Sequence, residues 1–274
     1  MQKVNPRLLK DVSATLRLLI YSSSTPAEDL ALEEAIQLEL EEGRSPETWR
    51  IWQASRRAVI LGTGQEAAKE VFLETAAGRN VDVLRRHSGG GAVVIGPGVL
   101  NFSAFHLIEN LPGSETIRGA MTAALRPLVE WLASFGIKAV EAGLSDLAIQ
   151  GSDGTLRKIA GNSQARKKRS VLVHGTILAD PDFSAISELL RFPSKVPDYR
   201  VGRDHRGFLT SLKEQGLPHD LQSLTQGIME QTERLSQAGN SSILMASQPT
   251  AAELSRAHEL LNEKYSRSEW NLRR

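Results

Sequence analysis

The pattern of apolar and polar positions begins with one well-marked helix. Thr25 stands where an N-cap is expected, Pro26 occupies the first helical position, and Glu28 completes the spacing of a capping box. Gly43 follows the last turn, as is typical of a helix end. Apolar residues recur on one side of this segment, which predicts a half-buried amphipathic helix. Residues 1–24 precede it and are interpreted as a leader.

Short β-like runs separated by glycines dominate the middle of the chain. Asp153 followed by Gly154 is a turn signal and predicts a hairpin between two of these runs. A second helix is predicted from Ser114, its expected cap, to Phe135, and Gly136 follows as the residue that ends it. The predicted strands are residues 48–53, 58–61, 81–85, 92–95, 100–107, 137–141, 146–150, 157–160 and 171–178.

The last third of the chain is helical in pattern. Residues 183–190, 220–237 and 251–264 have helical spacing, with one apolar run at 242–245. Because helices and strands do not alternate strictly, a parallel βαβ fold is disfavoured. The sequence therefore predicts an α+β fold with a mixed, mostly antiparallel sheet flanked by helices. A main domain over 25–217 and a small α-rich extension over 218–274 are the expected organisation.

Composition narrows the classes of protein. The 274 residues include 33 Lys and Arg against 32 Asp and Glu, a net charge of +1, which argues against a protein that mainly coats nucleic acid or an anionic membrane. There is no cysteine, so disulfides, thiolate metal sites and covalent catalysis through a protein thiol are excluded. No apolar run approaches the ~20 residues of a membrane span, and residues 16–21 are too few for a signal core. A cytoplasmic location is therefore expected.

Three consecutive glycines, Gly89, Gly90 and Gly91, lie between two strand-like runs. Glycine runs cost conformational entropy and are tolerated where the backbone approaches a ligand or points several N–H groups into one concavity. Arg85 and Arg86, shortly before them, supply forked cationic donors suited to carboxylate or phosphate. On the glycines alone, the alternative is a flexible turn with two solvated arginines.

Basic residues gather in the segment after Gly154. Lys158 lies within a strand-like run, and residues 166–169 are all Arg or Lys. Such an excess suits an anionic ligand such as a nucleotide. For residues 166–169 alone, a solvated surface loop is the alternative, and nucleic-acid binding would depend on that run only. His174 stands in an apolar strand, where a histidine is more often structural than catalytic.

In their order along the chain these segments resemble the lipoate–protein ligase branch of the biotin/lipoate ligase superfamily. The resemblance covers about residues 25–215 and implies the superfamily's catalytic-domain fold for residues 25–217. Biotin ligases carry a loop of alternating arginine and glycine in place of the triple glycine, so the lipoate side is favoured. The matching segments are Arg-Arg-His-Ser-Gly-Gly-Gly-Ala-Val at 85–93, Gly-Val-Leu-Asn-Phe-Ser at 98–103, Ser-Asp-Leu at 145–147, Lys-Ile-Ala-Gly-Asn-Ser-Gln at 158–164, His-Gly-Thr-Ile-Leu at 174–178 and, as in some members, residues 193–200.

The resemblance implies a defined chemistry. Lipoate or octanoate reacts with ATP and Mg²⁺ to form an acyl-adenylate and pyrophosphate, and a lysine of an acceptor protein then attacks the acyl carbonyl. The implied acceptors are lipoyl domains, such as those of 2-oxoacid dehydrogenase E2 or the glycine cleavage H protein. Single-chain ligases carry a larger C-terminal accessory domain than residues 218–274 provide. This tail is interpreted either as a reduced accessory element or as evidence that a separate accessory subunit exists.

The resemblance also assigns roles to single residues. Lys158 is the expected catalytic residue, because its ammonium can contact the acyl carbonyl and the α-phosphate as charge develops. Asp146 is a candidate metal ligand. The residues expected to bind the substrate or acyl-adenylate are Arg85, Arg86, Ser88, Gly89, Gly90, Gly91, Ala92, Asn101, Asp146, Gly161, Asn162, Ser163, His174, Gly175 and Thr176.

Two other functions stay open. Related octanoyltransferases transfer the acyl group through a cysteine thioester, without adenylation. Here residues 141–157 offer only Ser145 and Ser152, and a serine ester is a poorer acyl donor than a thioester. Direct transfer without a covalent intermediate remains an alternative. A non-catalytic module that only holds lipoylated domains is the second one, against which the retention of Lys158 within its motif argues.

Overall fold

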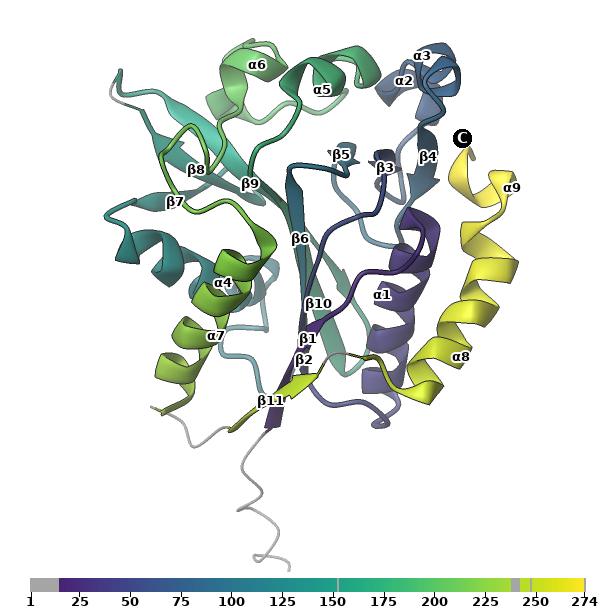
Figure 1. Cartoon of the computed structure of the whole chain (residues 1–274), viewed down its shortest axis with the longest axis vertical. Helices are drawn as coiled ribbons and strands as arrows, with labels where there is room; N and C mark the ends of the chain where they lie inside the picture. Colours follow the sequence, from purple (N-terminus) through teal and green to yellow (C-terminus); the bar gives the residue numbers. More distant parts are fainter. Residues whose placement is uncertain (1–14, 152, 238–241, 247, 274) are drawn as a thin grey trace, which may run out of the picture.

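An eight-stranded sheet runs through the middle of the molecule (Figure 1). The computed structural model describes residues 15–273 except 152, 238–241 and 247. In spatial order from β2 (Thr48–Trp52) to β7 (Ala139–Ala142), neighbouring strands are antiparallel, whereas β1 (Thr15–Ile20) is parallel to both β2 and β11 (Ser242–Ala246). The predicted α+β fold with a mixed, mostly antiparallel sheet is therefore confirmed. In spatial order the strands are β11 (Ser242–Ala246), β1 (Thr15–Ile20), β2 (Thr48–Trp52), β6 (Val99–Leu107), β10 (Ser170–Leu178), β9 (Leu156–Arg166), β8 (Asp146–Gln150) and β7 (Ala139–Ala142).

A second sheet has three strands, with β3 (Ala58–Leu61) between β4 (Asp82–Arg85) and β5 (Val93–Ile95). In Figure 1 it lies towards the top of the view, near several short helices. Apolar side chains of β3, α5 (Phe183–Leu189) and α6 (His205–Phe208) share one core, which joins the small sheet to these helices. The short elements are α2 (Ala67–Glu70), α3 (Leu73–Gly78), α5 (Phe183–Leu189), the 3₁₀ helix η2 (Asp198–Arg200) and α6 (His205–Phe208).

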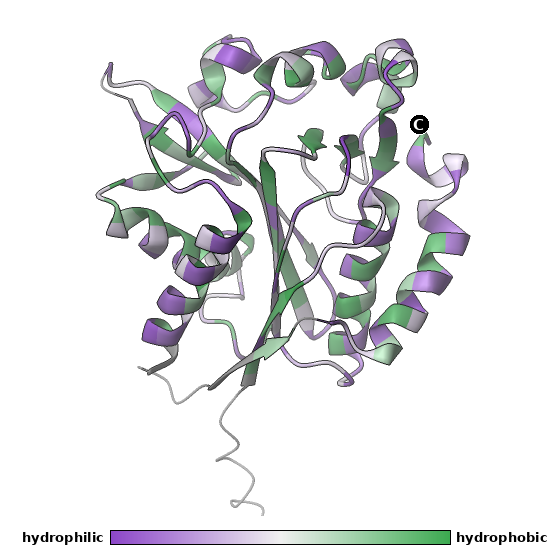
Figure 2. Ribbon diagram, viewed as in Figure 1, coloured by the Kyte–Doolittle hydropathy of each residue, from purple (hydrophilic) through white to green (hydrophobic). Residues whose placement is uncertain are grey.

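Helices cover both faces of the large sheet (Figure 1). On one side, α4 (Ile117–Ser134) and α7 (Leu221–Gln237) pack on a core that includes Trp131 and Ile228. On the other side, α1 (Pro26–Glu41) lies between the sheet and α8 (Ala251–Leu260). Figure 2 shows hydrophobic strands in the middle and hydrophilic outer surfaces on α7 and α8.

Helix α1 begins with the predicted capping box of Thr25 and Glu28. The expectation that it is only half buried is wrong, because α8 covers the side that an isolated amphipathic helix would expose. Its polar residues are buried as well: Asp29, Glu33, Glu34, Gln37 and Glu39.

The interpretation of residues 1–24 as a leader is wrong for residues 15–20, because these form β1 inside the large sheet. Residues 1–14 lie outside the described part of the chain. Towards the C-terminus, β11 pairs with β1, and α8 is followed by a π-helical turn, η3 (Leu261–Tyr265), and by α9 (Ser268–Asn271). Residues 218–274 thus contribute both a strand and helices to the layers of the main domain.

Two of the element boundaries that differ from the predictions have a clear physical reason. Thr116, not Ser114, caps α4, because its hydroxyl accepts from the Gly119 N–H, whereas the Ser114 hydroxyl donates to the Ile108 carbonyl. Strand β9 continues to Arg166, six residues beyond the predicted end, because β10 pairs with it along this length.

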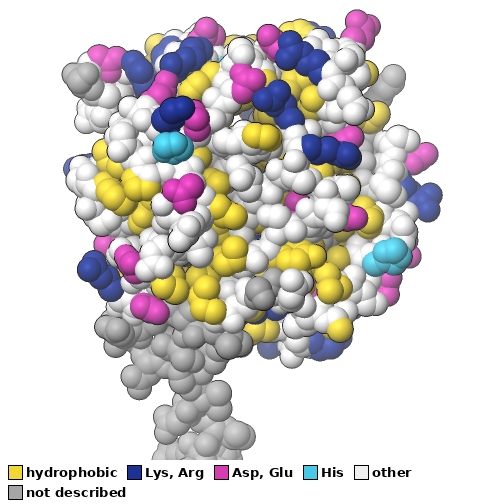
Figure 3. All heavy atoms as spheres, in the orientation of Figure 1, with side chains coloured by type: hydrophobic (Ala, Val, Ile, Leu, Met, Phe, Trp, Pro, Cys, Tyr) yellow, Lys and Arg dark blue, Asp and Glu magenta, His cyan; other side chains and the backbone are white. Residues whose placement is uncertain are grey.

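No helix among the described residues is long and apolar enough to cross a bilayer. On the face in Figure 3, basic and acidic side chains are interspersed rather than gathered into patches of one sign, in keeping with the near-zero net charge.

Candidate active site

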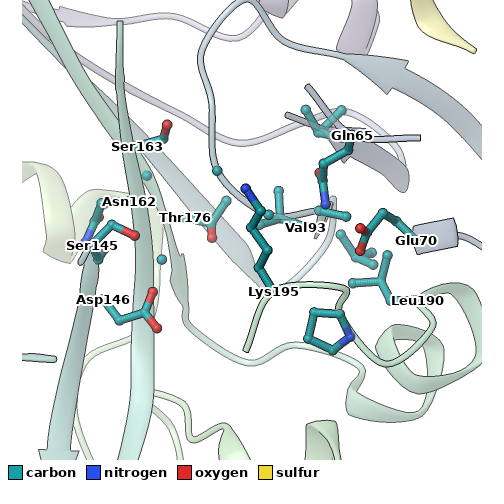
Figure 4. A pocket seen from close by; sticks show the side chains of 18 of the residues that line it. Gln65, Glu70, Val93, Ser145, Asp146, Asn162, Ser163, Thr176, Leu190 and Lys195 are labelled. Atoms are coloured by element: carbon teal, nitrogen blue, oxygen red, sulfur yellow. Dashed lines mark hydrogen bonds between the residues drawn. The ribbon is translucent and has the colours of Figure 1, made fainter. Parts of the chain in front are cut away.

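A cavity of about 1030 Å³ lies between β9 and β10 of the large sheet, β5 of the small sheet and the helices α5 and α6. The structure therefore gathers segments that lie more than a hundred residues apart. Figure 4 shows Asp146, Ser145 and Asn162 along one wall, and Gln65 and Glu70 along another. The predicted site residues that line the cavity are Lys158, Arg86, Gly89, Gly90, Gly91, Ala92, Asn101, Asp146, Gly161, Asn162, Ser163, His174, Gly175 and Thr176.

A β-bulge sets the direction of the Lys158 side chain. Residues 158 and 161 would face opposite sides of a regular strand. The register between β8 and β9 shifts, however: Asp146 pairs with Gly161 and Ala148 with Lys158, which leaves Ile159 as an extra residue. Lys158 consequently faces the same side as Gly161, and a Cβ at position 161 would lie 2.6 Å from the Lys158 Nζ.

Lys158 forms an ion pair with Asp146, with 2.8 Å between Nζ and Oδ1. The hydroxyl of Tyr199 donates to the other carboxylate oxygen of Asp146 at 2.8 Å. Burial and the neighbouring Asp146 raise the pKa of Tyr199 well above its usual range, so this hydroxyl keeps its proton. The side chain of Lys158 is 22% exposed, so its ammonium can still reach a ligand in the cavity.

The glycine loop over residues 88–92 has its carbonyls held by cationic and hydroxyl donors. Arg86 donates from Nε to the Gly89 carbonyl at 3.1 Å and from Nη2 to the Gly91 carbonyl at 2.9 Å. Ser163 donates to the Gly89 carbonyl as well, at 2.9 Å. Within the described residues, the N–H groups of Gly89, Gly90 and Gly91 have no acceptor. Free N–H groups beside a buried guanidinium form a concavity suited to an anion.

Arg86 remains charged at neutral pH, although burial lowers its pKa to about 10. Close packing explains Gly62, and a positive φ explains Gly90. A Cβ at Gly62 would lie 2.1 Å from the Gly90 carbonyl oxygen, and Gly90 itself has a φ of +86°.

Arg85 does not line the cavity, so the expectation that it binds the substrate is corrected. It is fully buried, and its guanidinium N–H groups donate to backbone carbonyls. Nη1 donates to Gly62 and Gln65, at 2.8 and 2.6 Å, and Nε donates to Trp270 at 2.9 Å. Arg85 therefore joins the C-terminal helix α9 to the cavity wall.

Ser88 also lies outside the cavity lining and is 2% exposed. Its hydroxyl lies 2.6 Å from Nε2 of His174, whose Nδ1 lies 2.8 Å from Glu33. Burial opposes the ionisation of Glu33, but the imidazole of His174 and the hydrogen bonds from His174 and Ser103 outweigh it and lower the pKa to about 2. Glu33 is thus a buried carboxylate at the edge of the cavity.

Sequence reasoning missed several residues of the cavity, including Glu33, Gln65, Glu70 and Lys195. Figure 4 shows the Lys195 side chain directed into the cavity from the loop after α5. Lys195 lies in the segment 193–200, whose resemblance to some family members was the available signal. For Glu33 the sequence carries no such signal, because an acidic residue in a helical pattern ordinarily faces the solvent.

Asp146 is the predicted metal ligand on its wall of the cavity, and its two carboxylate oxygens contact Lys158 and Tyr199. The Asn162 Oδ1 is buried and has no hydrogen-bond partner, and Asp146 and Ser145 line the same wall. No cluster of three or more His, Cys, Asp or Glu suited to a metal occurs among the described residues. One carboxylate supplemented by phosphate oxygens is the kind of site that Mg²⁺ prefers.

The basic run 166–169 lies away from the cavity, at the turn between β9 and β10. Arg166 donates to the Ser114 carbonyl at 2.7 Å, and the Arg169 N–H donates to Glu41 at 3.0 Å. These contacts match the expectation of a surface loop for this run and give it no part in the cavity.

The site is thus a cavity beside a β-sheet, with a lysine on one strand and a glycine loop next to it. This arrangement agrees with the comparison of the sequence with known families. Residues 25–233 match the lipoyl protein ligase A/B catalytic domain, and the chain belongs to this family. It is 27% identical to the octanoyltransferase LipM of Brevibacillus brevis, with 94% of this chain and 99% of that protein aligned.

Solved structures agree with this assignment. A bipartite lipoate protein ligase of Thermoplasma acidophilum, studied with its E2 lipoyl domain, has a TM-score of 0.77 and 26% identity, over 93% of this chain and 95% of that one. A lipoate-protein ligase A bound with ATP has a TM-score of 0.74 and 25% identity, over 93% and 98%.

Proposed function

We propose that this chain is an ATP-dependent lipoate–protein ligase. The carboxylate oxygen of lipoate or octanoate attacks the α-phosphorus of ATP, and pyrophosphate leaves. The amine of an acceptor lysine then attacks the acyl carbonyl, AMP leaves, and the new amide nitrogen loses one proton. One observation carries the proposal: an ammonium group, Lys158, lies in a cavity with a glycine loop suited to an anion, in a chain that has no cysteine.

Lys158 is proposed to stabilise the negative charge that develops on the acyl carbonyl and the phosphate during both steps. The N–H groups of the glycine loop would bind the phosphate or carboxylate. Apolar residues of the same cavity, among them Leu30, Trp52 and Phe102, would surround the acyl chain. Asp146 would hold Mg²⁺ together with phosphate oxygens, and the ion would supply charge neutralisation for the phosphates when bound.

The proposed acceptor is a lipoyl domain of the kind found in 2-oxoacid dehydrogenase E2 or in the glycine cleavage H protein. The Thermoplasma acidophilum relative supports a lipoyl domain as partner, because that ligase was studied with its E2 lipoyl domain. It is described as bipartite, and this chain covers 95% of the compared Thermoplasma chain. A separate accessory subunit is therefore part of the proposal.

An octanoyltransferase that acts without adenylation is the second candidate. The alignment with the octanoyltransferase LipM, which spans nearly the whole of both chains, favours it. The absence of cysteine weighs against a thioester route, because the remaining hydroxyls near Lys158 would form a less reactive ester. Transfer directly from an acyl carrier to the acceptor lysine would need no covalent enzyme intermediate.

Exchange of labelled pyrophosphate into ATP distinguishes the two candidates. The ligase predicts exchange that depends on lipoate or octanoate, and the transferase predicts none. Mass spectrometry of a lipoyl domain incubated with ATP and each acid, with and without a candidate accessory chain, then reports the second step. Modification from an octanoyl carrier protein but not from ATP and free acid would contradict the ligase.

Replacing Lys158 by Ala tests the catalytic assignment. We expect acceptor modification to slow about 100-fold or more, the usual cost of losing one charge-stabilising donor. Lys168→Ala is the matched control, because Lys168 is exposed at the turn between β9 and β10. Unchanged modification by Lys158→Ala would remove Lys158 from the mechanism.

A further inference from the structure

Five polar side chains link helix α1 to the glycine loop through buried hydrogen bonds. Arg86 Nε lies 3.0 Å from the Ser88 Oγ, Ser88 Oγ lies 2.6 Å from His174 Nε2, and His174 Nδ1 lies 2.8 Å from Glu33. Ser103 donates to the second oxygen of Glu33 at 2.6 Å. All five are at most 7% exposed, so water does not compete for these contacts.

With a neutral His174 imidazole, the chemistry of the groups sets one direction for this series of hydrogen bonds. Arg86 can only donate, so the hydroxyl of Ser88 accepts from it and keeps its own proton for His174. His174 then accepts at Nε2 and donates from Nδ1 to Glu33, which accepts only. In this arrangement each proton shared between these side chains has an acceptor, which is the condition for a stable buried network.

Serine, histidine and glutamate in this order have the connectivity of a nucleophilic triad, but the surroundings exclude that role. Ser88 lies outside the cavity lining and is 2% exposed, so a substrate carbonyl has no access to its Oγ. Its lone pair is also occupied by the Nε–H of Arg86. The side chain that this network controls is therefore Arg86.

Arg86 needs an exact orientation, because it is the group that holds the loop carbonyls. Its Nη1 donates to the Ile60 carbonyl at 3.2 Å, while Nε and Nη2 face Gly89 and Gly91. If the guanidinium turned, those carbonyls would be free to rotate toward the cavity and would repel an anion.

We propose that Glu33, His174 and Ser88 are positioning residues that fix Arg86 and thereby hold the glycine loop in its anion-binding conformation. The proposal rests on the proposed function in one respect, namely that the anion is a phosphate of ATP. It changes the part expected of Ser88 and His174: they act through Arg86 rather than by contact with the substrate.

Crystal structures of Ser88→Ala and His174→Asn test the positioning directly. His174→Asn keeps an N–H donor near Glu33 and removes the acceptor for Ser88. We expect the Arg86 guanidinium to leave the Gly89 and Gly91 carbonyls in both variants. An unmoved Arg86 in both would overturn the proposal, whether or not the wild type is a ligase.

Kinetics of ATP–pyrophosphate exchange give the second readout. Each variant should raise the KM for ATP about tenfold, the cost of one weakened hydrogen-bonded contact, with kcat nearly unchanged. The double variant should be no worse than either single one, because both break the same link. Glu39→Gln, a buried acid of α1 that pairs with Arg44 and Arg256 instead, is the control and should leave KM unchanged.

Three outcomes would count against the network as a positioning device. Multiplied effects in the double variant would mean that Ser88 and His174 act separately. A fall in kcat without a change in KM would indicate a chemical role. An acyl ester trapped on Ser88 and found by mass spectrometry would make Ser88 a nucleophile. Loss of exchange in the wild type would refute the ligase proposal alone, because the crystal structures still decide the position of Arg86.

Discussion

At the scale of single residues, small side chains decide what the large ones can do. Gly161 leaves the space that the end of Lys158 occupies, and Gly175 leaves the space for the Asn162 amide, whose Oδ1 would lie 2.2 Å from an added Cβ. Neither glycine has a positive φ, so close approach and not backbone conformation explains them. Substitutions here separate function from stability.

Gly161→Ala should displace the ammonium of Lys158 at little cost in stability. The added Cβ would meet Nζ and Cε, the flexible end of the side chain, at 2.6 and 2.7 Å. A shift of about 1 Å in a charge-stabilising group can lower kcat roughly 100-fold, and we expect a loss of that order in acceptor modification. Gly78→Ala, with no atom within 4 Å of the added Cβ, is the control. Equal rates in the two variants would contradict this reasoning.

His87 makes stability depend on pH. Its Nε2 lies 2.9 Å from the Gln37 side chain, and burial lowers its pKa from 6.5 to about 4. Between these two values the unfolded chain binds a proton that the folded one does not, so acid favours unfolding. The free energy of unfolding should fall as the pH drops from 6.5 to 4, by up to about 1.4 kcal/mol per unit from this group.

Urea titrations of the wild type and of His87→Gln at pH 4 to 7 measure this contribution. The difference between the two free-energy profiles should shrink or reverse toward pH 4, because the variant lacks the titrating imidazole. Parallel profiles would show that His87 has the same pKa in both states.

At the scale of elements, the C-terminal helix α9 supports the cavity wall from behind, through Arg85 and Thr63. The Trp270 indole donates to the Arg85 carbonyl at 2.8 Å, the Arg85 N–H donates to the Asn271 side chain at 3.0 Å, and Arg273 donates to the Thr63 carbonyl at 2.9 Å. Thr63 and Gln65 line the cavity. Two segments some two hundred residues apart thus support each other through Arg85 and Arg273.

Arg85→Lys should destabilise the protein more than an arginine replacement usually does. An ammonium cannot reach the carbonyls that the guanidinium joins, which leaves several buried acceptors unpaired at roughly 1–3 kcal/mol each. We expect a loss of about 2–4 kcal/mol in the free energy of unfolding. Arg79→Lys, in an exposed pair with Glu188, should change it by less than about 1 kcal/mol. Equal losses in urea unfolding would show that the Arg85 contacts carry no special weight.

At the scale of the whole molecule, the two ends of the described chain share one sheet and one buried ion pair. Arg17 of β1 donates to Glu253 of α8 at 3.0 Å, and Ser45 donates to the same carboxylate at 2.7 Å. Both charged side chains are at most 4% exposed. The C-terminal segment is therefore expected to unfold together with the rest rather than as a separate unit.

Urea unfolding followed by circular dichroism and by tryptophan fluorescence should give one coincident transition. Glu253→Gln leaves Arg17 buried without its counter-charge and should lower the free energy of unfolding by about 3–5 kcal/mol for both probes. Glu188→Gln, in the exposed pair with Arg79, is the control. Two separate transitions, of which Glu253→Gln shifts only one, would instead support residues 218–274 as an independent extension.

Features that depend on neighbours along the chain could be predicted from the amino-acid sequence. The capping box of Thr25 and Glu28, the Gly136 that ends α4, and most strand positions are local features, and the structure confirms them. The family could also be recognised, because the segments that carry the resemblance keep their residue types and order. Local hydrogen bonds and backbone preferences are sufficient for such predictions.

The directions of the side chains and the elements that cover them became clear from the three-dimensional arrangement. One extra residue, Ile159, turns Lys158 toward Asp146, and no local signal announces it. Arg85 and Arg86 are adjacent and chemically alike, yet one holds the C-terminus and the other the glycine loop. The physical reason is that orientation and burial depend on strand register and on partners far along the chain, such as β11 beside β1 and α8 over α1.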